Sequence, residues 1–157
     1  MAEWSANASQ TVNPGETVIF TETEVPCTRG FVRHREGTGD FVLAGWVPSR
    51  GGCRCRCKQA NSAIYNVGFS GNIAIPTGET VGEISLAITV NGTTIPSSTM
   101  IQTPAAVEEY ANVSVEKAVP IWRNCCQTVA VRNTSSVPIL VQNANITFSR
   151  PDLAVTY

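Results

Sequence analysis

Apolar side chains recur at every second position along much of this chain. In the stretch from Ser62 to Pro104, Tyr65, Val67 and Phe69 alternate with small or polar residues. The same alternation runs from Ile84 to Val90. A period of two places alternate side chains on opposite faces of an extended strand. Two strands, each with one apolar face, are therefore predicted in this stretch.

A hairpin is predicted directly after the second of these strands. Asn91-Gly92 is a dipeptide in which both residues tolerate positive φ, as a type I′ turn requires. Thr93 to Ile95 then begins the return strand. Strands that are apolar on one side only need a second sheet to cover them.

The rest of the chain continues the pattern of short extended runs separated by Gly, Pro and Asn turns. The last run is expected to break at Gln142-Asn143, and Thr103 to Glu109 is long enough for one helical turn only. Together with the central stretch this gives about eight to ten strands, which is typical of an all-β sandwich or barrel. The further strands are predicted at residues 17–20, 31–34, 41–44, 112–117, 127–132 and 137–148.

The length of 157 residues indicates one domain with a core of its own. We assign residues 13–157 to this domain and residues 1–12, which are polar apart from Trp4, to an N-terminal arm. An exposed tryptophan is costly, so Trp4 is expected to anchor the arm by docking onto a neighbouring subunit. Local packing of Trp4 is the alternative.

The chain carries few charges. Hydrophobic residues make up 43% and charged residues 15% of the sequence, against roughly 25% charged in an average protein. Either other chains hide much of the surface, or Ser, Thr and Asn make it polar without charge. The net charge of −1 provides no field that would attract nucleic acid.

The sequence shows no sign of a membrane span or a secretory signal. No apolar run approaches the ~18 residues that a membrane-spanning helix needs. The first ten residues lack the basic start and apolar segment of a signal peptide. We therefore expect synthesis in the cytoplasm.

The order of the motifs between residues 13 and 149 resembles the C1q/tumour-necrosis-factor-like (C1q/TNF-like) jelly roll. Each motif is short, and their order and spacing carry the resemblance. The resemblance implies a two-sheet jelly-roll sandwich and a compact homotrimer, with one sheet of each subunit near a threefold axis. The matching motifs are Asn13 to Glu16 leading into Ile19-Phe20, Gly37 to Phe41, Tyr65 to Phe69, Ile84 to Gly92, Val129 to Asn133, and Ile139 to Phe148.

The chain departs from the secreted animal members, because it has no collagen stalk and an unusual cysteine set. It looks more like small bacterial and phage-encoded relatives, which are virion or surface components. This resemblance implies a non-catalytic structural or adhesive trimer, such as a phage capsid decoration or fibre head, whose partners are a capsid or surface protein or a glycan. A soluble carbohydrate- or receptor-binding module is the alternative. Tyr65, Phe69 and Phe148 are expected in the core or at the threefold interface.

The six cysteines permit several states. Cys53, Cys55 and Cys57 alternate with Arg54, Arg56 and Lys58, so on a strand the thiols share one face and the cations the other. Neighbouring thiols on one face are then ~6.6 Å apart, at the edge of disulfide reach. Any bridges should therefore link the three separate segments that contain Cys27, Cys53 to Cys57, and Cys125-Cys126.

Structural disulfides are the favoured state of these cysteines, because the count is even and a β fold tolerates bridges. Reduced, packed thiols are the second possibility. A metal site is the third, although the usual Cys-x-x-Cys spacing is absent and His34 is the one histidine. No cofactor or metal is expected.

Basic residues concentrate in one part of the sequence, where Glu36 and Asp40 are the acidic residues. This region either contacts an acidic partner or is a solvated sheet face whose cations discourage edge pairing, and we favour the second explanation. It contains seven of the eleven Lys and Arg residues: Arg29, Arg33, Arg35, Arg50, Arg54, Arg56 and Lys58.

Nothing in the sequence indicates catalysis. His34 lies between Arg33 and Arg35, and a structural hydrogen bond is its expected role. A Gly-x-Ser-x-Gly elbow, a phosphate-binding loop and a helix with paired metal ligands are all absent from the sequence. Five Asn-x-Ser/Thr triplets are expected to be turns and strand ends. They begin at Asn7, Asn91, Asn112, Asn133 and Asn145.

Overall fold

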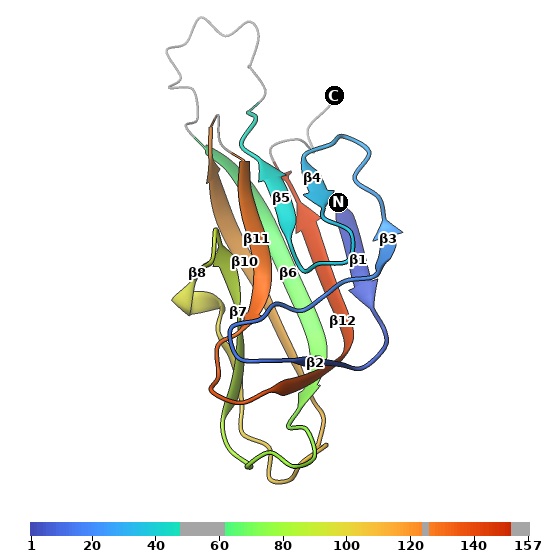
Figure 1. Cartoon of the computed structure of the whole chain (residues 1–157). Helices are drawn as coiled ribbons and strands as arrows, with labels where there is room; N and C mark the ends of the chain where they lie inside the picture. The colour runs from blue at the N-terminus through green and yellow to red at the C-terminus, as the bar shows by residue number, and fades with distance from the viewer. Residues whose placement is uncertain (48–61, 124–125, 152–157) are drawn as a thin grey trace, which may run out of the picture.

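The computed structural model describes residues 1–47, 62–123 and 126–151, and in these ranges nearly all regular structure is β-strand. The strands form two antiparallel sheets that face each other (Figure 1). The prediction of an all-β, two-sheet sandwich is therefore confirmed. The elements are β1 (Ala2–Ala6), β2 (Gln10–Val12), β3 (Glu22–Val25), β4 (Val32–His34), β5 (Phe41–Ala44), β6 (Ser62–Ala74), β7 (Ile84–Val90), β8 (Thr93–Thr94), the 3₁₀ turn η1 (Pro96–Ser98), β9 (Met100–Gln102), β10 (Ala111–Trp122), β11 (Cys126–Asn133) and β12 (Ile139–Ser149).

Strands distant in sequence lie side by side in both sheets. Sheet A has the order β10-β6-β12-β1-β3, and β2 also pairs with β12. Sheet B has the order β4-β5-β11-β7-β8, and β9 also pairs with β7. The longest pairing joins β6 to β10, from Ser62 opposite Trp122 to Ile73 opposite Ala111.

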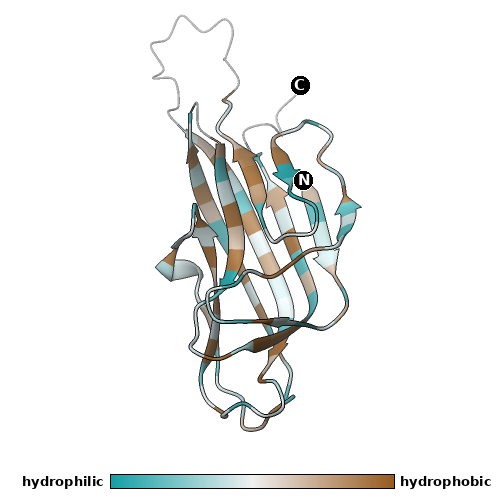
Figure 2. Cartoon of the chain, in the orientation of Figure 1, coloured by the Kyte–Doolittle hydropathy of each residue, from teal (hydrophilic) through white to brown (hydrophobic). Residues whose placement is uncertain are grey.

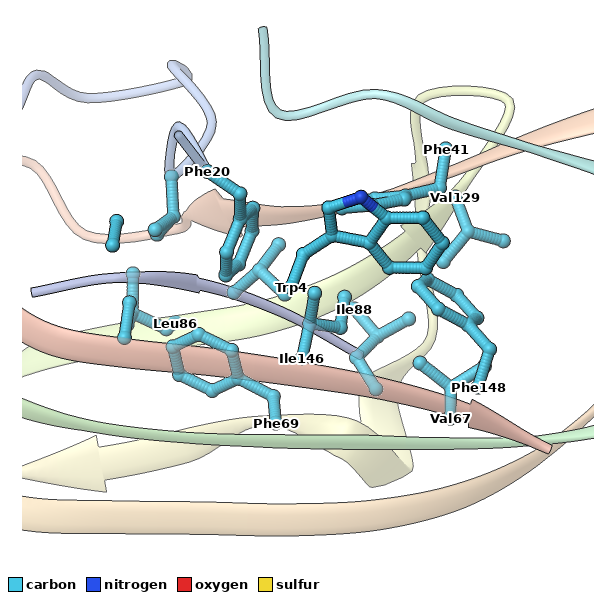
Figure 3. Packing of buried hydrophobic residues seen from close by; sticks show 14 of the residues in the cluster. Trp4, Phe20, Phe41, Val67, Phe69, Leu86, Ile88, Val129, Ile146 and Phe148 are labelled. Atoms are coloured by element: carbon cyan, nitrogen blue, oxygen red, sulfur yellow. The ribbon is translucent and has the colours of Figure 1, made fainter. Parts of the chain in front are cut away.

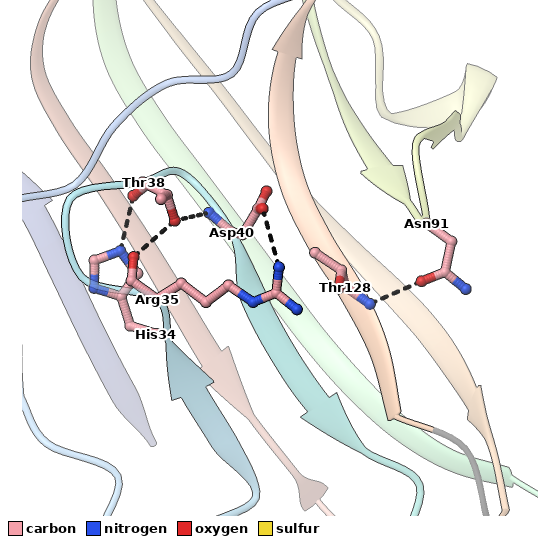
Figure 4. A network of polar contacts seen from close by, with 6 residues as sticks. All are labelled: His34, Arg35, Thr38, Asp40, Asn91 and Thr128. Atoms are coloured by element: carbon pink, nitrogen blue, oxygen red, sulfur yellow. Dashed lines mark hydrogen bonds and ion pairs between the residues drawn. The ribbon is translucent and has the colours of Figure 1, made fainter.

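The predicted hairpin turn is present between β7 and β8. Asn91 and Gly92 both have positive φ, at 48° and 80°, and Val90 lies opposite Thr93. The side-chain oxygen of Asn91 also accepts a hydrogen bond of 2.9 Å from the backbone N–H of Thr128 in β11 (Figure 4). The turn residue therefore ties the hairpin to the neighbouring strand.

The predicted break in the last strand is also present, as a bulge. Asn143 has a φ of 52°, and the register of β12 against β6 shifts between Gln142 and Asn145. The extra residues bend the strand without ending it, which is the usual effect of a bulge.

The core fills the space between the sheets with one apolar face from each. Apolar and polar residues alternate along the long strands (Figure 2). Aromatic rings meet at the centre, where Phe41 lies 5.0 Å from Trp4 and 4.9 Å from Phe148 between ring centroids (Figure 3). Such tilted pairs contribute about 0.5–1.5 kcal/mol each beyond the burial of their area. Tyr65 and Phe69 are buried in the same core, so they and Phe148 have no exposed surface for a threefold interface.

The prediction of a separate arm over residues 1–12 is wrong. β1 lies inside sheet A, where Ala2 faces Phe148 and Ala6 faces Ala144 of β12. Trp4 is 5% exposed and packs against core rings of its own chain. Docking onto a neighbouring subunit is therefore excluded for Trp4, and the local-packing alternative is correct.

The segment predicted as a first strand at residues 17–20 crosses the sandwich as an irregular segment. Thr17 forms one isolated bridge with Arg132, while Val18 and Phe20 are fully buried. Gly39 makes this crossing possible, because a Cβ on Gly39 would lie 2.1 Å from the carbonyl oxygen of Val18. Residues 103–109 are not helical either, and Glu108 has a φ of 55° in a turn.

A buried amide links three segments at one end of the sandwich. The Asn133 side chain donates 2.9 Å hydrogen bonds to the carbonyl oxygens of Val12 and Val137. Its oxygen accepts hydrogen bonds from the backbone N–H and the hydroxyl of Ser135. Asn133 is buried, so this Asn-x-Ser triplet has the structural role that the sequence predicted.

Trp4→Ala is expected to lower the free energy of unfolding by about 3–5 kcal/mol, because it leaves a cavity among the core rings. Tyr110→Ala is the matched control, since this ring is 39% exposed and lies outside the core, and its expected change is below about 1 kcal/mol. Urea denaturation measures both. An unchanged midpoint for Trp4→Ala, accompanied by dissociation of the protein, would restore the docked-arm hypothesis.

Asn133→Ala is expected to cost about 2–4 kcal/mol, because it leaves buried carbonyl groups without donors. Asn7→Ala is its control, since Asn7 begins another Asn-x-Ser triplet, is exposed, and donates a 3.2 Å side-chain hydrogen bond to Glu22. Thermal unfolding should give a lower melting temperature for Asn133→Ala than for its control. Equal melting temperatures would show that the Asn133 bonds contribute nothing net.

Candidate interaction surfaces

The outer face of sheet A is an open sheet surface with very few charges. We use this name for the outward side chains of β6, β10 and β12, which are small and mostly polar. Glu116 is the one charged residue among these positions, all of which the structure describes. The acidic Glu3 of β1 borders them, and its Oε1 accepts a 2.6 Å hydrogen bond from Asn145 Nδ2. Low charge density is typical of the centre of a protein interface. The outward positions are Ser62, Ile64, Asn66, Gly68, Ser70 and Asn72; Asn112, Ser114, Glu116, Ala118, Pro120 and Trp122; and Leu140, Gln142, Asn145, Thr147 and Ser149.

One corner of this face is apolar. Ile64 lies directly opposite Pro120, and Trp122 follows two residues later on the same side of β10. Ile64 is 43% exposed and Trp122 is 59% exposed. β10 is the edge strand of sheet A, and a proline in an edge strand removes one donor that another chain could pair with. The corner therefore favours side-chain contact over the addition of a strand.

A second surface feature lies where β5 ends. Trp46 follows β5 by two residues, and its indole is 61% exposed. The guanidinium carbon of Arg150 lies 6.0 Å from this ring and 5.1 Å from the ring of Tyr65. Arg150 Nη1 donates a 2.6 Å hydrogen bond to the carbonyl oxygen of Trp46. The sequence pattern did not identify Trp46 or Arg150, although an isolated tryptophan beside Gly45 and an arginine directly after the last strand were visible there.

The predicted disulfides are not tested by the described residues. Cys27 is a free thiol whose sulfur accepts a 3.5 Å hydrogen bond from the N–H of Val32, and Cys126 is exposed. The other four candidates, Cys53, Cys55, Cys57 and Cys125, lie outside the described residues. Connectivity and redox state therefore remain predictions.

Three of the seven clustered basic residues can be placed. Arg33 and Arg35 are exposed, and Arg35 forms a 3.8 Å ion pair with Asp40. An exposed pair of this kind contributes about 0–1 kcal/mol. Arg29 is exposed in the turn before Phe31. Arg50, Arg54, Arg56 and Lys58 lie outside the described residues.

His34 has a structural environment. Its Nε2 donates a 2.9 Å hydrogen bond to the carbonyl oxygen of Thr38 (Figure 4). Its ring stacks on Phe41, with ring centroids 4.6 Å apart. The Thr38 hydroxyl donates in turn to the carbonyl oxygen of Arg35. These contacts close the β4–β5 turn, and they match the structural role that the sequence predicted for His34.

Among the residues that can be placed, no group of three or more His, Cys, Asp or Glu side chains could hold a metal ion. Within the same residues, no helix is long and apolar enough to cross a membrane.

The comparisons with known proteins establish the fold alone. No family model and no curated protein matches the chain. Among solved structures it is similar to the Eiger tumour necrosis factor of S. frugiperda, with a TM-score of 0.63 and 10% identity over 99% of this chain and 95% of that one. It is also similar to the globular domain of a zebrafish complement 1qA protein, with a TM-score of 0.57 and 10% identity over 93% and 94% of the two chains. The chain therefore has a C1q/TNF-like jelly-roll fold.

Proposed function

We propose that this chain is a non-catalytic structural or adhesive protein that assembles as a homotrimer through the outer face of sheet A. The supporting observation is that the part of this face formed by β6, β10 and β12 has one charged residue, Glu116, and an apolar corner at Ile64, Pro120 and Trp122, while the acidic Glu3 of β1 lies at its border. Desolvating small hydroxyl and amide groups costs less than desolvating lysines or carboxylates. The face is therefore suited to lie against another copy.

Glycine and hydrogen-bonded amides make this face suitable for close contact. Gly68 lies at its centre, and a Cβ there would meet the Thr147 hydroxyl oxygen at 2.6 Å. Asn112 Nδ2 donates a 3.2 Å bond to Asn72 Oδ1, so these two side chains partly satisfy each other. A surface of short side chains that already bond to one another loses little side-chain entropy when it is buried.

We further propose that the trimer is displayed on a surface, as a phage capsid decoration, a fibre head or a bacterial surface component. This proposal rests on the resemblance to small bacterial and phage-encoded jelly rolls. Trp4 does not anchor the trimer, because it lies in the core of its own chain. Exposed residues anchor the trimer in this proposal, and a capsid or other surface protein is the proposed partner.

A soluble carbohydrate- or receptor-binding module is the second candidate function. It is favoured by the exposed and well-supported indole of Trp46, which has no evident structural need to be exposed. The two functions are compatible, since a displayed trimer can also carry binding sites.

Ser70→Arg is expected to convert a three-chain assembly into single chains. Ser70 lies opposite Ser114 on one side and Asn145 on the other, so the substitution places a large cation in the middle of the outer face. Native mass spectrometry at micromolar concentration reads the assembly directly. Thr128→Arg on β11 is the control, because it adds the same cation to a half-buried position of sheet B and should leave the trimer intact.

Two results would contradict the homotrimer. One is a wild-type protein that stays at the mass of one chain up to about 100 μM, a concentration well above the dissociation constants of stable assemblies. The other is a Ser70→Arg variant that remains trimeric, which would place the interface on a different face.

The surface role predicts where the protein is found. Antibodies against the folded domain should label intact virions or cells in immunogold microscopy, and the neighbouring genes should encode capsid, portal or other surface proteins. Labelling that appears only after lysis, together with unrelated neighbouring genes, would contradict this part of the proposal.

A further inference from the structure

The indole of Trp46 is exposed although the structure holds it firmly. It lies beyond the end of β5 with 61% of its surface accessible. Single exposed apolar side chains are common on protein surfaces, so the exposure of Trp46 gains meaning from the contacts that hold it. Trp46 is supported at both its backbone and its ring.

Arg150 provides both supports. It donates from Nη1 to the carbonyl oxygen of Trp46 at 2.6 Å, and its guanidinium lies over the same residue's ring. Arg150 itself is 4% exposed. Removing a guanidinium from water is expensive, and the cation–π contacts of a desolvated arginine offset part of this cost.

Tyr65 contacts Arg150 from the side of the core and fixes its position. Its ring lies 5.1 Å from the guanidinium carbon and is completely buried. Its hydroxyl lies 2.6 Å from the carbonyl oxygen of Ala44 and 3.1 Å from that of Phe31. The Phe31 carbonyl also accepts a 3.0 Å bond from the N–H of Ala44. The three side chains Tyr65, Arg150 and Trp46 therefore form a stack rooted in the core, which we call the indole stack.

The indole stack restricts which ligand can lie on the outer face of Trp46. A flat, rigid aromatic face binds the apolar C–H face of a sugar ring at a small entropic cost. A ligand cation would be repelled by Arg150 behind the ring, so a quaternary ammonium group is disfavoured. Exposed arginines at the same end, Arg29 before Phe31 and Arg123 after β10, favour an acidic group instead.

We propose that Trp46 is the stacking platform of a saccharide-binding site, and that its ligands are pyranose sugars bearing a carboxylate, sulfate or phosphate group. The indole stacks on the ring face of the sugar, and the arginines of this end attract the acid group. The inference rests on the second proposed function and not on the homotrimer. It assigns a residue and a ligand class to that binding role.

A glycan array tests the site. The array carries acidic glycans with uronate, sialate, sulfate or phosphate groups, together with their neutral parent sugars. Wild-type protein should give signals confined to acidic glycans, and Trp46→Ala should weaken them at least about tenfold, which corresponds to 1.4 kcal/mol. Tyr110→Ala removes an exposed aromatic ring at the opposite end of β10, outside both candidate surfaces, and should keep the signals. Trp46→Phe, which retains an aromatic ring, should keep part of them.

A second measurement does not depend on any variant. The three tryptophans give three indole N–H signals in an NMR spectrum, and the strongest acidic glycan from the array should shift the signal of Trp46 alone. The inference is overturned if wild-type protein gives no signal on any acidic glycan, if neutral sugars bind equally well, or if Trp46→Ala binds like wild type.

Native mass spectrometry of the same samples separates this inference from the homotrimer. A trimer without glycan signals overturns the saccharide site alone. A single chain with signals that depend on Trp46 overturns the homotrimer and supports the site.

Discussion

The contact between the two sheets at Phe41 is the interaction on which the rest of the structure depends. This ring, from sheet B, packs against Trp4 and Phe148 of sheet A, Phe20 of the crossing segment and His34 of the adjacent strand. Neither sheet could keep its apolar face in water, so each is stable only while the other covers it. The crossing segment at residues 17–20 and the turn closed by His34 both take their positions from this contact.

The parts of the fold that were predictable are those determined by neighbours in sequence. The alternation in β6 and β7, the turn at Asn91-Gly92 and the bulge at Gln142-Asn143 all depend on a few adjacent residues. The misassigned N-terminal arm shows the opposite case, since β1 is identified as a strand only through its pairing with β12 at the other end of the chain. The indole stack was missed for the same reason, because Trp46 and Arg150 are 104 residues apart.

The two candidate surfaces differ in how they are built. The outer face of sheet A consists of small side chains in regular alternation, so its character follows from the strand pattern and suits a large, flat contact. The indole stack consists of three large side chains from distant segments, and it holds a single ring in one orientation. Broad complementarity and a rigid anchor are different requirements of recognition, and this sandwich provides them in separate places.

The position of β12 has a consequence for how the protein is made. It lies between β6 and β1 in sheet A, although it follows all the other described strands along the chain. Until β12 has been synthesised, the nascent sheet lacks a central strand, and both flanking strands have open edges. Contacts of such long sequence separation form slowly. The sandwich therefore closes only after β12 has been synthesised and has paired, and its incomplete form must be kept from aggregating until then.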